Sequence, residues 1–318
     1  MVPKANHPGH ENRVDHSIVP LSNAHEFVPL LSSDLMRLAT AILAAANVSL
    51  ALSVLCVGLR ASPQEARYLP RHRGMLFRSL LATSVLTPLF ALWAALVFEL
   101  RQPVGVALVA LALSPLPSFL PTRTMKLGGD TEFSLSLCVV SDLLAVGLIP
   151  MSVLLLASVF SPPHIGPGVV AGLLATSVLL PLLAGAGVRR LAVNTANRVV
   201  KPITIASTAI LGIALAAMLP GSWAALPQVV DQDTFIAVVL MTLVGLGVGH
   251  ACGGPARSDR TALAIATTER HPALAIAVGT IAFPNDHVAG AVILFSLLVG
   301  TIATMAYMSL SRFALPRL

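Results

Sequence analysis

Apolar runs long enough to cross a membrane recur along the chain from residue 35 to residue 311. A transmembrane helix needs about 20 mostly apolar residues, because the hydrocarbon layer is roughly 30 Å thick and each residue rises about 1.5 Å. Charged residues, proline or glycine bound the runs 35–59, 76–98, 103–121, 132–159, 168–188, 199–219, 233–252, 261–283 and 287–311. Hydrophobic residues make up 56% of the chain and charged residues only 11%, so the core of a water-soluble protein could not bury all the hydrophobic side chains. We therefore predict an all-α polytopic membrane protein with about nine transmembrane helices.

A polar leader, residues 1–34, precedes the runs, and residues 35–318 form the predicted transmembrane domain. The leader contains several histidines, His7, His10, His16 and His25. A metal site is one interpretation of these histidines, but their irregular spacing and the surrounding Pro, Asn and Ser residues favour a mobile tail. We predict neither a bound metal nor a cofactor.

The basic residues of the short loops lie mostly on one side of the predicted membrane. That side holds Arg60, Arg67, Arg71, Arg73, Arg123, Lys126, Arg189, Arg190, Arg198, Lys201, Arg257, Arg260, Arg312 and Arg317. The other side holds Lys4, Arg13 and Arg101. Because basic loops stay in the cytoplasm, we predict a multi-pass inner-membrane protein whose N-terminus is outside and whose C-terminus is cytoplasmic. The same distribution accounts for the net charge of +6 without a nucleic-acid partner.

The third run cannot form one unbroken helix. It ends with Pro115, Pro117 and Pro121, and each proline removes a backbone donor. A simple kink is the alternative interpretation, but three prolines this close together favour unwinding. Since freed carbonyls are costly in lipid, an unwound segment belongs against protein or a water-filled cavity.

The eighth run carries Glu269, Arg270, His271 and Pro272 in the middle of an otherwise apolar sequence. Arg270 lies too far from either end of the run for its side chain to reach the membrane surface easily. Ionisable side chains at this depth face the protein interior or water, and they commonly mark a solute or proton pathway. A structural salt bridge from Arg270 to Glu269 or Asp142 is the alternative.

Two interrupted helices, one in each half of a chain, are typical of transporters built from inverted repeats. We assign residues 35–159 to the first repeat and residues 168–311 to the second. The first repeat has one helix fewer than the second, so we expect that its opening helix is missing. With that offset, the two interrupted helices take the same place in their repeats.

Three stretches also carry a resemblance to a known family: 114–121, then Gly129, Asp130, Ser134, Cys138, Ser141 and Pro150, then 262–275. They fall where that family has a Cys-Pro-Gly-Gly-Thr-x-Ser-Asn crossover, then Gly-Asn, Ser, Thr, Ser and Pro, then a second crossover with Glu followed by Gln-Asn-Ser-Gly-Leu-Ala. Over nearly all its runs the chain resembles the bile acid:sodium symporter family. The resemblance implies an inverted-repeat secondary transporter that binds its solute where the two broken helices cross, near the bilayer midplane.

The chain departs from the family where the resemblance would imply sodium sites. Sodium is a hard cation, and the family binds it with carboxylate, amide and hydroxyl oxygens. Here Leu120-Pro121 replaces Ser-Asn, Cys138 replaces Thr, Ala266 replaces Glu, and Arg270 replaces Gln, while Ser134 is retained. We therefore do not expect sodium coupling, and a proton is favoured over sodium as the coupling ion.

The resemblance also places Arg270 where relatives bind a cation, so its guanidinium would keep a positive charge at the crossover. A guanidinium pairs with a carboxylate through two parallel hydrogen bonds. The predicted solute is therefore a small organic anion, either bile-acid-like or a monocarboxylate. The predicted substrate-binding residues are Ser118, Ser134, Thr267, Thr268, Arg270 and His271.

The fourth run supplies a candidate for energy coupling. Ser134, Cys138, Ser141 and Asp142 recur at spacings of three and four, so they can share one helix face. Asp142 is either a proton-titrating group or an ion-pair partner of Arg270. Glu269 is a second candidate for coupling or for an ion pair.

Other function classes fit the sequence less well. A proton-coupled antiporter of related fold, with Asp142 and Glu269 as carriers, is the nearest alternative. Arsenite efflux proteins fit less well, because the crossover Cys and Glu that they use are missing here. A membrane-embedded enzyme would need a catalytic motif, and we find no HExxH, GxSxG, DDxxD or Gly-rich phosphate loop. We predict that the chain is not an enzyme.

Overall fold

The computed structural model describes residues 24–160, 168, 172, 175–229, 231–283 and 286–313. The chain divides into two compact units, residues 1–38 and 39–318, and both interrupted runs lie in the second. The side chains of the leader histidines lie outside the described part of the chain, as does the start of the fifth run. Among the described residues, no group of three or more His, Cys, Asp or Glu side chains could hold a metal ion.

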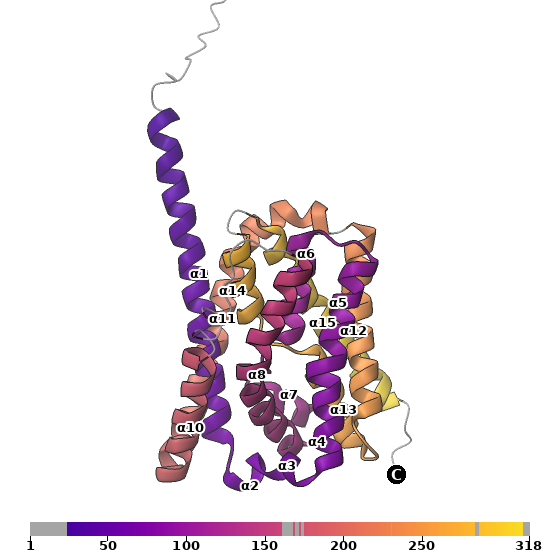
Figure 1. Ribbon diagram of the computed structural model, residues 1–318. Coiled ribbons are helices and arrows are strands. Elements are labelled where there is room, and N and C mark those ends of the chain that lie inside the picture. Colours follow the sequence, from indigo (N-terminus) through magenta and orange to yellow (C-terminus); the bar gives the residue numbers. More distant parts are fainter. Residues whose placement is uncertain are drawn as a thin grey trace, which may run out of the picture. The chain divides into compact units, whose positions relative to one another are not determined.

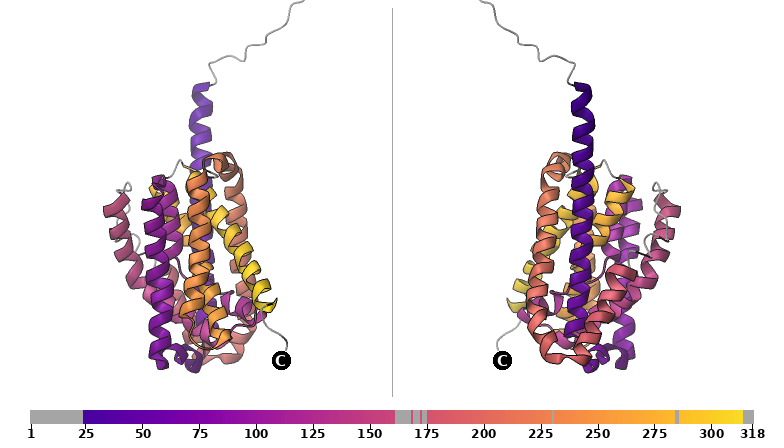
Figure 2. Two further views of the ribbon diagram at one scale, coloured as in Figure 1. Left: turned by 90° about the vertical axis from the view of Figure 1, so that its right-hand side faces the viewer. Right: turned by 90° about the vertical axis from the view of Figure 1, so that its left-hand side faces the viewer.

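The described residues form helices joined by short loops, and they contain no strand (Figures 1 and 2). The α-helices of the first half are α1 (Ala24–Arg60), α2 (Pro63–Ala66), α3 (Tyr68–Arg71), α4 (Arg73–Leu80), α5 (Thr87–Val97), α6 (Gln102–Leu113), α7 (Leu120–Lys126) and α8 (Thr131–Phe160). Those of the second half are α10 (Leu180–Leu191), α11 (Val193–Val229), α12 (Gln232–Cys252), α13 (Arg257–Thr268), α14 (Ala273–Ala282) and α15 (Val288–Phe313). Two π-helical turns, η2 (Leu81–Leu86) and η3 (Ala175–Leu179), lead into α5 and α10.

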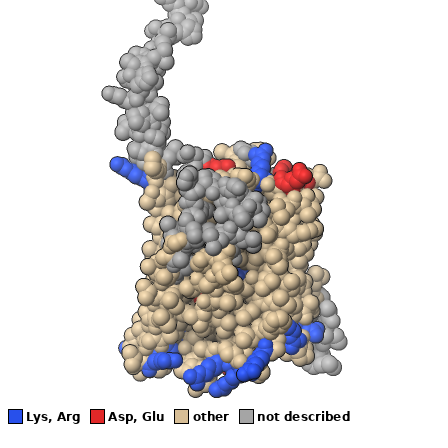
Figure 3. Space-filling view, viewed as in Figure 1, with Lys and Arg blue, Asp and Glu red and all other residues tan. Residues whose placement is uncertain are grey.

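Six helices in the described residues are long and apolar enough to cross a membrane. They are Met36–Arg60, Arg73–Val97, Thr131–Met151, Val193–Pro227, Gln232–Cys252 and Val288–Leu310. Large apolar side chains such as Trp93, Ile213 and Leu298 are exposed on them, and few charged residues interrupt the middle of the face in Figure 3. The prediction of an all-helical multi-pass membrane protein is thus confirmed. The total of about nine spans stays a prediction, because the fifth run is only partly described and the third and eighth are each divided into short helices.

The third run is interrupted between α6 and α7. Ser114 has extended backbone angles (φ −61°, ψ 147°), as residues before proline prefer. Pro115 and Pro117 lie in the unwound segment, and Pro121 stands in the first turn of α7, where a missing N–H costs nothing. We call residues 114–119 the first break.

The eighth run is interrupted between α13 and α14. Glu269 is extended (φ −98°, ψ 112°), and Pro272 precedes the first residue of α14. We call residues 269–272 the second break. The backbone N–H of His271 donates a 2.9 Å hydrogen bond to the carbonyl oxygen of Pro115, so the two breaks are in direct contact.

The helices that lead into and out of the breaks form the centre of this unit. Every residue of α6 from Val104 to Ala112 is buried, and so is every residue of α14 from Ala273 to Gly279. α6 packs against α5, α8, α14 and α15, and α7 packs against α8 and α13. A helix that is apolar on all sides belongs in such a centre, and its burial fixes the position of the break at its end.

α1 packs closely against α10 at Gly58, and we expect that a larger residue at this position lowers the stability of the fold. A Cβ atom at Gly58 would lie 2.5 Å from the carbonyl oxygen of Leu182, whereas one at Gly187 would meet nothing within 4 Å. Gly58→Ala should therefore lower the free energy of unfolding by roughly 1–2 kcal/mol, because backbone must shift to admit the methyl group. Thermal unfolding of the detergent-purified variants would measure this, with Gly187→Ala as the matched control. Equal melting temperatures for the two variants would contradict the close contact.

Candidate functional site

Arg270 is the centre of the candidate site. Its residue is only 7% exposed, although it belongs to an unwound segment. One terminal nitrogen donates to the carbonyl oxygen of Thr83 at 2.5 Å, and the other lies 3.4 Å from the carbonyl oxygen of Ser114. Its Nε has no partner among the described residues. The guanidinium therefore connects η2 to the first break through backbone carbonyls.

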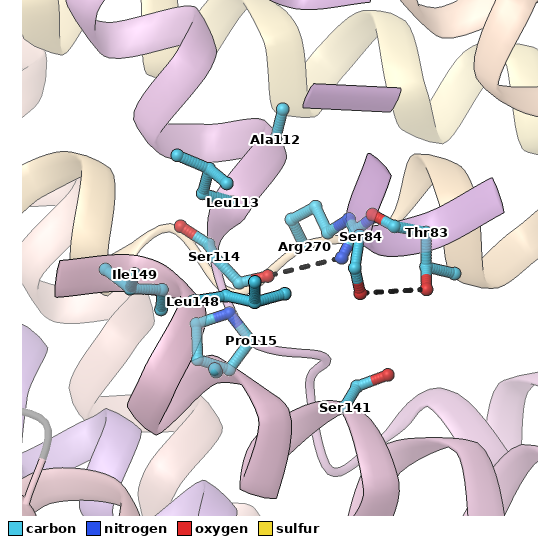
Figure 4. A pocket seen from close by; sticks show the side chains of 11 residues that line it. Thr83, Ser84, Ala112, Leu113, Ser114, Pro115, Ser141, Leu148, Ile149 and Arg270 are labelled. Atoms are coloured by element: carbon cyan, nitrogen blue, oxygen red, sulfur yellow. Dashed lines mark hydrogen bonds between the residues drawn. The ribbon is translucent and has the colours of Figure 1, made fainter. Parts of the chain in front are cut away.

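A pocket with about 330 Å³ of empty space opens on one side of Arg270 (Figure 4). Its polar lining is Thr83, Ser84, Ser114, Ser141 and Arg270. Its apolar lining is Ala112, Leu113, Pro115, Ala145, Leu148 and Ile149. The pocket thus combines one fixed positive charge, several hydroxyl groups and an apolar wall.

A second pocket, with about 340 Å³ of empty space, is also lined by Arg270. α12, α13 and α15 supply its other polar residues, Thr242, Thr267, Thr268 and Ser296. Leu111, Val238 and Met241 complete the lining. One guanidinium is therefore shared by two pockets, one toward α8 and one toward α12 and α15.

Glu269, the neighbour of Arg270, has a different ion-pair partner. Its carboxylate lies 2.7 Å from the guanidinium of Arg123 on α7, and its side chain is 7% exposed. Consecutive residues of an extended segment point to opposite sides, so Glu269 and Arg270 face different neighbours. Within the described residues, Arg270 is not in an ion pair with Glu269 or with Asp142.

Two of the predicted substrate-binding residues share a pocket with Arg270. Thr267 and Thr268 line the second pocket, and both hydroxyl groups already donate to backbone carbonyls. The Thr267 hydroxyl reaches the carbonyl oxygen of Gly245 at 2.7 Å, which attaches α13 to α12. A bound solute would therefore meet these hydroxyl oxygens as acceptors, or would have to displace the existing bonds.

The other predicted residues, Ser118, Ser134 and His271, are buried but line neither Arg270 pocket. The Ser134 hydroxyl donates to the carbonyl oxygen of Asp130 at the start of α8. His271 lies in the second break, with its Nε2 3.4 Å from the Ser49 hydroxyl oxygen. The backbone N–H of Ser118 donates to the hydroxyl oxygen of Ser53. The contacts of His271 and Ser118 hold the breaks against α1, whereas the Ser134 bond is local to the start of α8.

Sequence reasoning missed the polar face of α1 that carries these contacts. Arg60 donates to the carbonyl oxygen of Ser118 at 3.1 Å and to the hydroxyl of Thr122 at 3.0 Å. It also reaches Thr204 on α11 at 3.1 Å. Ser49, Ser53 and Arg60 follow one another at helical spacing, which is the signal that could have revealed a shared face. Thr83, Ser84 and Ser114, also missed, are small hydroxyl residues inside apolar runs.

A helical multi-pass fold with two unwound, buried segments that meet at a charged residue is the architecture of a membrane transporter. The sequence profile described as the Sodium Bile acid symporter family matches residues 47–226, which is more than half of the chain. The chain belongs to this family of membrane transporters. None of the curated proteins matches it significantly. The matched residues include the first break but end before the second, so Arg270 lies outside them.

Proposed function

We propose that this protein is a secondary transporter that moves a small organic anion across the inner membrane and binds it beside Arg270, where the two breaks meet. The observation that carries the proposal is a buried guanidinium that lines two pockets and has no carboxylate partner among the described residues. A charge held inside a membrane protein without an ion-pair partner is costly, and a solute of opposite charge offsets that cost.

The chemistry of Arg270 favours a carboxylate as the anionic group. The guanidinium presents a planar array of donors, its Nε has no partner in the described part of the chain, and its carbonyl contacts hold it in one orientation. A carboxylate can accept two parallel hydrogen bonds from such a group. Ser141, whose hydroxyl has no partner among the described residues, would donate a further hydrogen bond, whereas Thr267 and Thr268 would donate only if their present bonds to backbone carbonyls were broken. Ser118 and His271 would act indirectly, by positioning the breaks, and Ser134 would stabilise the start of α8.

The size of the pockets favours a monocarboxylate over a bile-acid-like solute. Each has about 330–340 Å³ of empty space. That figure includes open solvent, and only about 20 Å³ in the first pocket and 30 Å³ in the second can be entered by a water-sized molecule, so the site has to open for a solute, and least for a small one. We also propose that residues 35–159 and 168–311 are inverted repeats. Their corresponding breaks would then form the solute site near the bilayer midplane.

Sodium independence is the first expected result. Leu120, Cys138 and Ala266 are fully buried and supply no hard oxygen ligand from their side chains. In a thermal-stabilisation screen of purified protein with small organic anions, a ligand should raise the melting temperature equally in sodium and in choline buffers. A saturable requirement for sodium would show that other oxygens assemble a cation site. Failure of every organic anion to stabilise the protein would overturn the proposed substrate class.

The proposed topology has its own test. Basic side chains gather along one edge of the molecule in Figure 3, near the end of the fold where α2 and α3 lie, which supports assignment of that edge to the cytoplasm. A reporter that is active only in the cytoplasm should work when fused after Leu318. The same reporter should be silent when inserted at residues 161–166. Activity at the second position would reverse the orientation.

A further inference from the structure

Asp142 is a buried carboxyl group that the solute site does not use. It lies on α8, about 16 Å along the helix from its first residue, and is fully buried. Neither of its oxygens has a hydrogen-bond partner among the described residues. Buried carboxylates normally have hydrogen-bond donors or a cation beside them, because an unpaired buried charge is very costly.

The charged groups around α8 do not neutralise Asp142. α6 and η3 carry no titratable side chain. The titratable residues of the other packed helices are Glu65 on α2, Tyr68 and Arg71 on α3, Arg123 and Lys126 on α7, and Arg257, Asp259 and Arg260 on α13. On α8 itself, Cys138 lies one turn earlier, near enough to interact with Asp142 and with Arg60 of α1. None of these groups, and none of Glu269, Arg270 and His271, forms a hydrogen bond or ion pair with the Asp142 carboxyl.

We propose that Asp142 is a proton-binding site and that its carboxyl group is protonated in this conformation. The bound proton removes the charge that the surroundings leave uncompensated. A hydronium ion in the water that enters the Arg270 pocket delivers this proton, so that an O–H bond forms on the carboxylate and a neutral water molecule remains. Ser141, the adjacent residue, lines that pocket. The backbone N–H of Leu116, in the first break, lies near the carboxyl group but makes no hydrogen bond of good geometry with it.

The position of Asp142 couples this proton to the solute, an extension that rests on the proposed function. A neutral Asp142 leaves the positive charge of Arg270 available to an organic anion, whereas an ionised Asp142 adds a negative charge near the same pocket. Binding of the proton and of the anion therefore reinforce one another, and the reinforcement is reciprocal. The protein would accordingly carry the anion and the proton in the same direction.

Infrared spectroscopy of the purified protein in lipid nanodiscs, without any solute, tests the proton site directly. A protonated carboxyl group has a distinct carbonyl stretching band. In protein made with isotope-labelled aspartate, we expect a label-shifted band at neutral pH that disappears as the pH is raised. Asp142→Asn should abolish this band, because the amide has the shape of the protonated acid but no carboxyl group. Asp286→Asn, at an exposed position, is the matched control and should retain it.

Absence of the labelled band in wild-type protein would overturn the proposal, as would its survival in a folded Asp142→Asn variant. Should Asp142→Asn not fold, Asp142→Glu decides the question. The band should then lose its dependence on labelled aspartate and acquire a dependence on labelled glutamate. Because no solute is present, a failed anion screen with a positive infrared result would refute the substrate class and leave the proton site intact.

Discussion

Arg270→Lys is expected to weaken binding of the organic anion by roughly ten- to a hundredfold while the protein stays folded. A hydrogen bond to a charged group contributes about 1.5–3 kcal/mol, and about 1.4 kcal/mol is a factor of ten in affinity. Lysine keeps the positive charge but cannot donate two parallel hydrogen bonds to one carboxylate. Arg270→Ala should lose binding more completely, and it also leaves the carbonyl oxygens of Thr83 and Ser114 without their donor.

The measurement is anion affinity together with thermal stability for each variant. Arg78→Ala is the matched control, because Arg78 is exposed and, among the described residues, donates only to the carbonyl oxygen of Gly74 one turn earlier in its own helix. Wild-type anion affinity in a well-folded Arg270→Ala protein would refute the role of this residue.

Arg270 and Asp142 are not in an ion pair in the described residues, so the stability losses of Arg270→Ala and Asp142→Ala should add in the double variant. Recovery of stability in that variant would reveal a pairing in another conformation.

Arg123→Ala is expected to lower the free energy of unfolding by about 2–3 kcal/mol. The change leaves the carboxylate of Glu269, 7% exposed, without its only ion-pair partner in the described residues. Loss of one partner of a buried pair costs roughly 3–5 kcal/mol, and the 27% exposure of Arg123 reduces that figure. Because the pair joins α7 to the second break, its loss should also loosen the contact between the two breaks.

A double variant separates the charge effect from simple loss of packing. Adding Glu269→Gln to Arg123→Ala removes the unpaired charge and should restore most of the stability. Lys126→Ala, an exposed position on the same helix, is the control for loss of a positive charge on α7. Thermal unfolding of the wild-type protein, Arg123→Ala, the double variant and Lys126→Ala would measure these differences in stability. If Arg123→Ala were as stable as Lys126→Ala, the ion pair would contribute nothing.

Several features of this protein follow from local sequence alone. A run such as 233–252 becomes one helix because its length matches the bilayer and because few charges interrupt it. The first break follows from Pro115, Pro117 and Pro121, because a residue without an N–H cannot continue a helical hydrogen-bond ladder. The family resemblance was also visible in the sequence, and the family match over residues 47–226 confirms it.

The contacts within the site depended on the tertiary structure. The sequence could not show that Arg270 bonds the carbonyls of Thr83 and Ser114, while the adjacent Glu269 pairs with Arg123. A carbonyl group is present at every residue, so sequence carries no sign of which one will accept a bond. The direction of each side chain depends on how segments more than a hundred residues apart rotate and pack against one another. For the same reason Ser118 and Ser134, sensible candidates by residue type, lie outside the pockets that Arg270 lines.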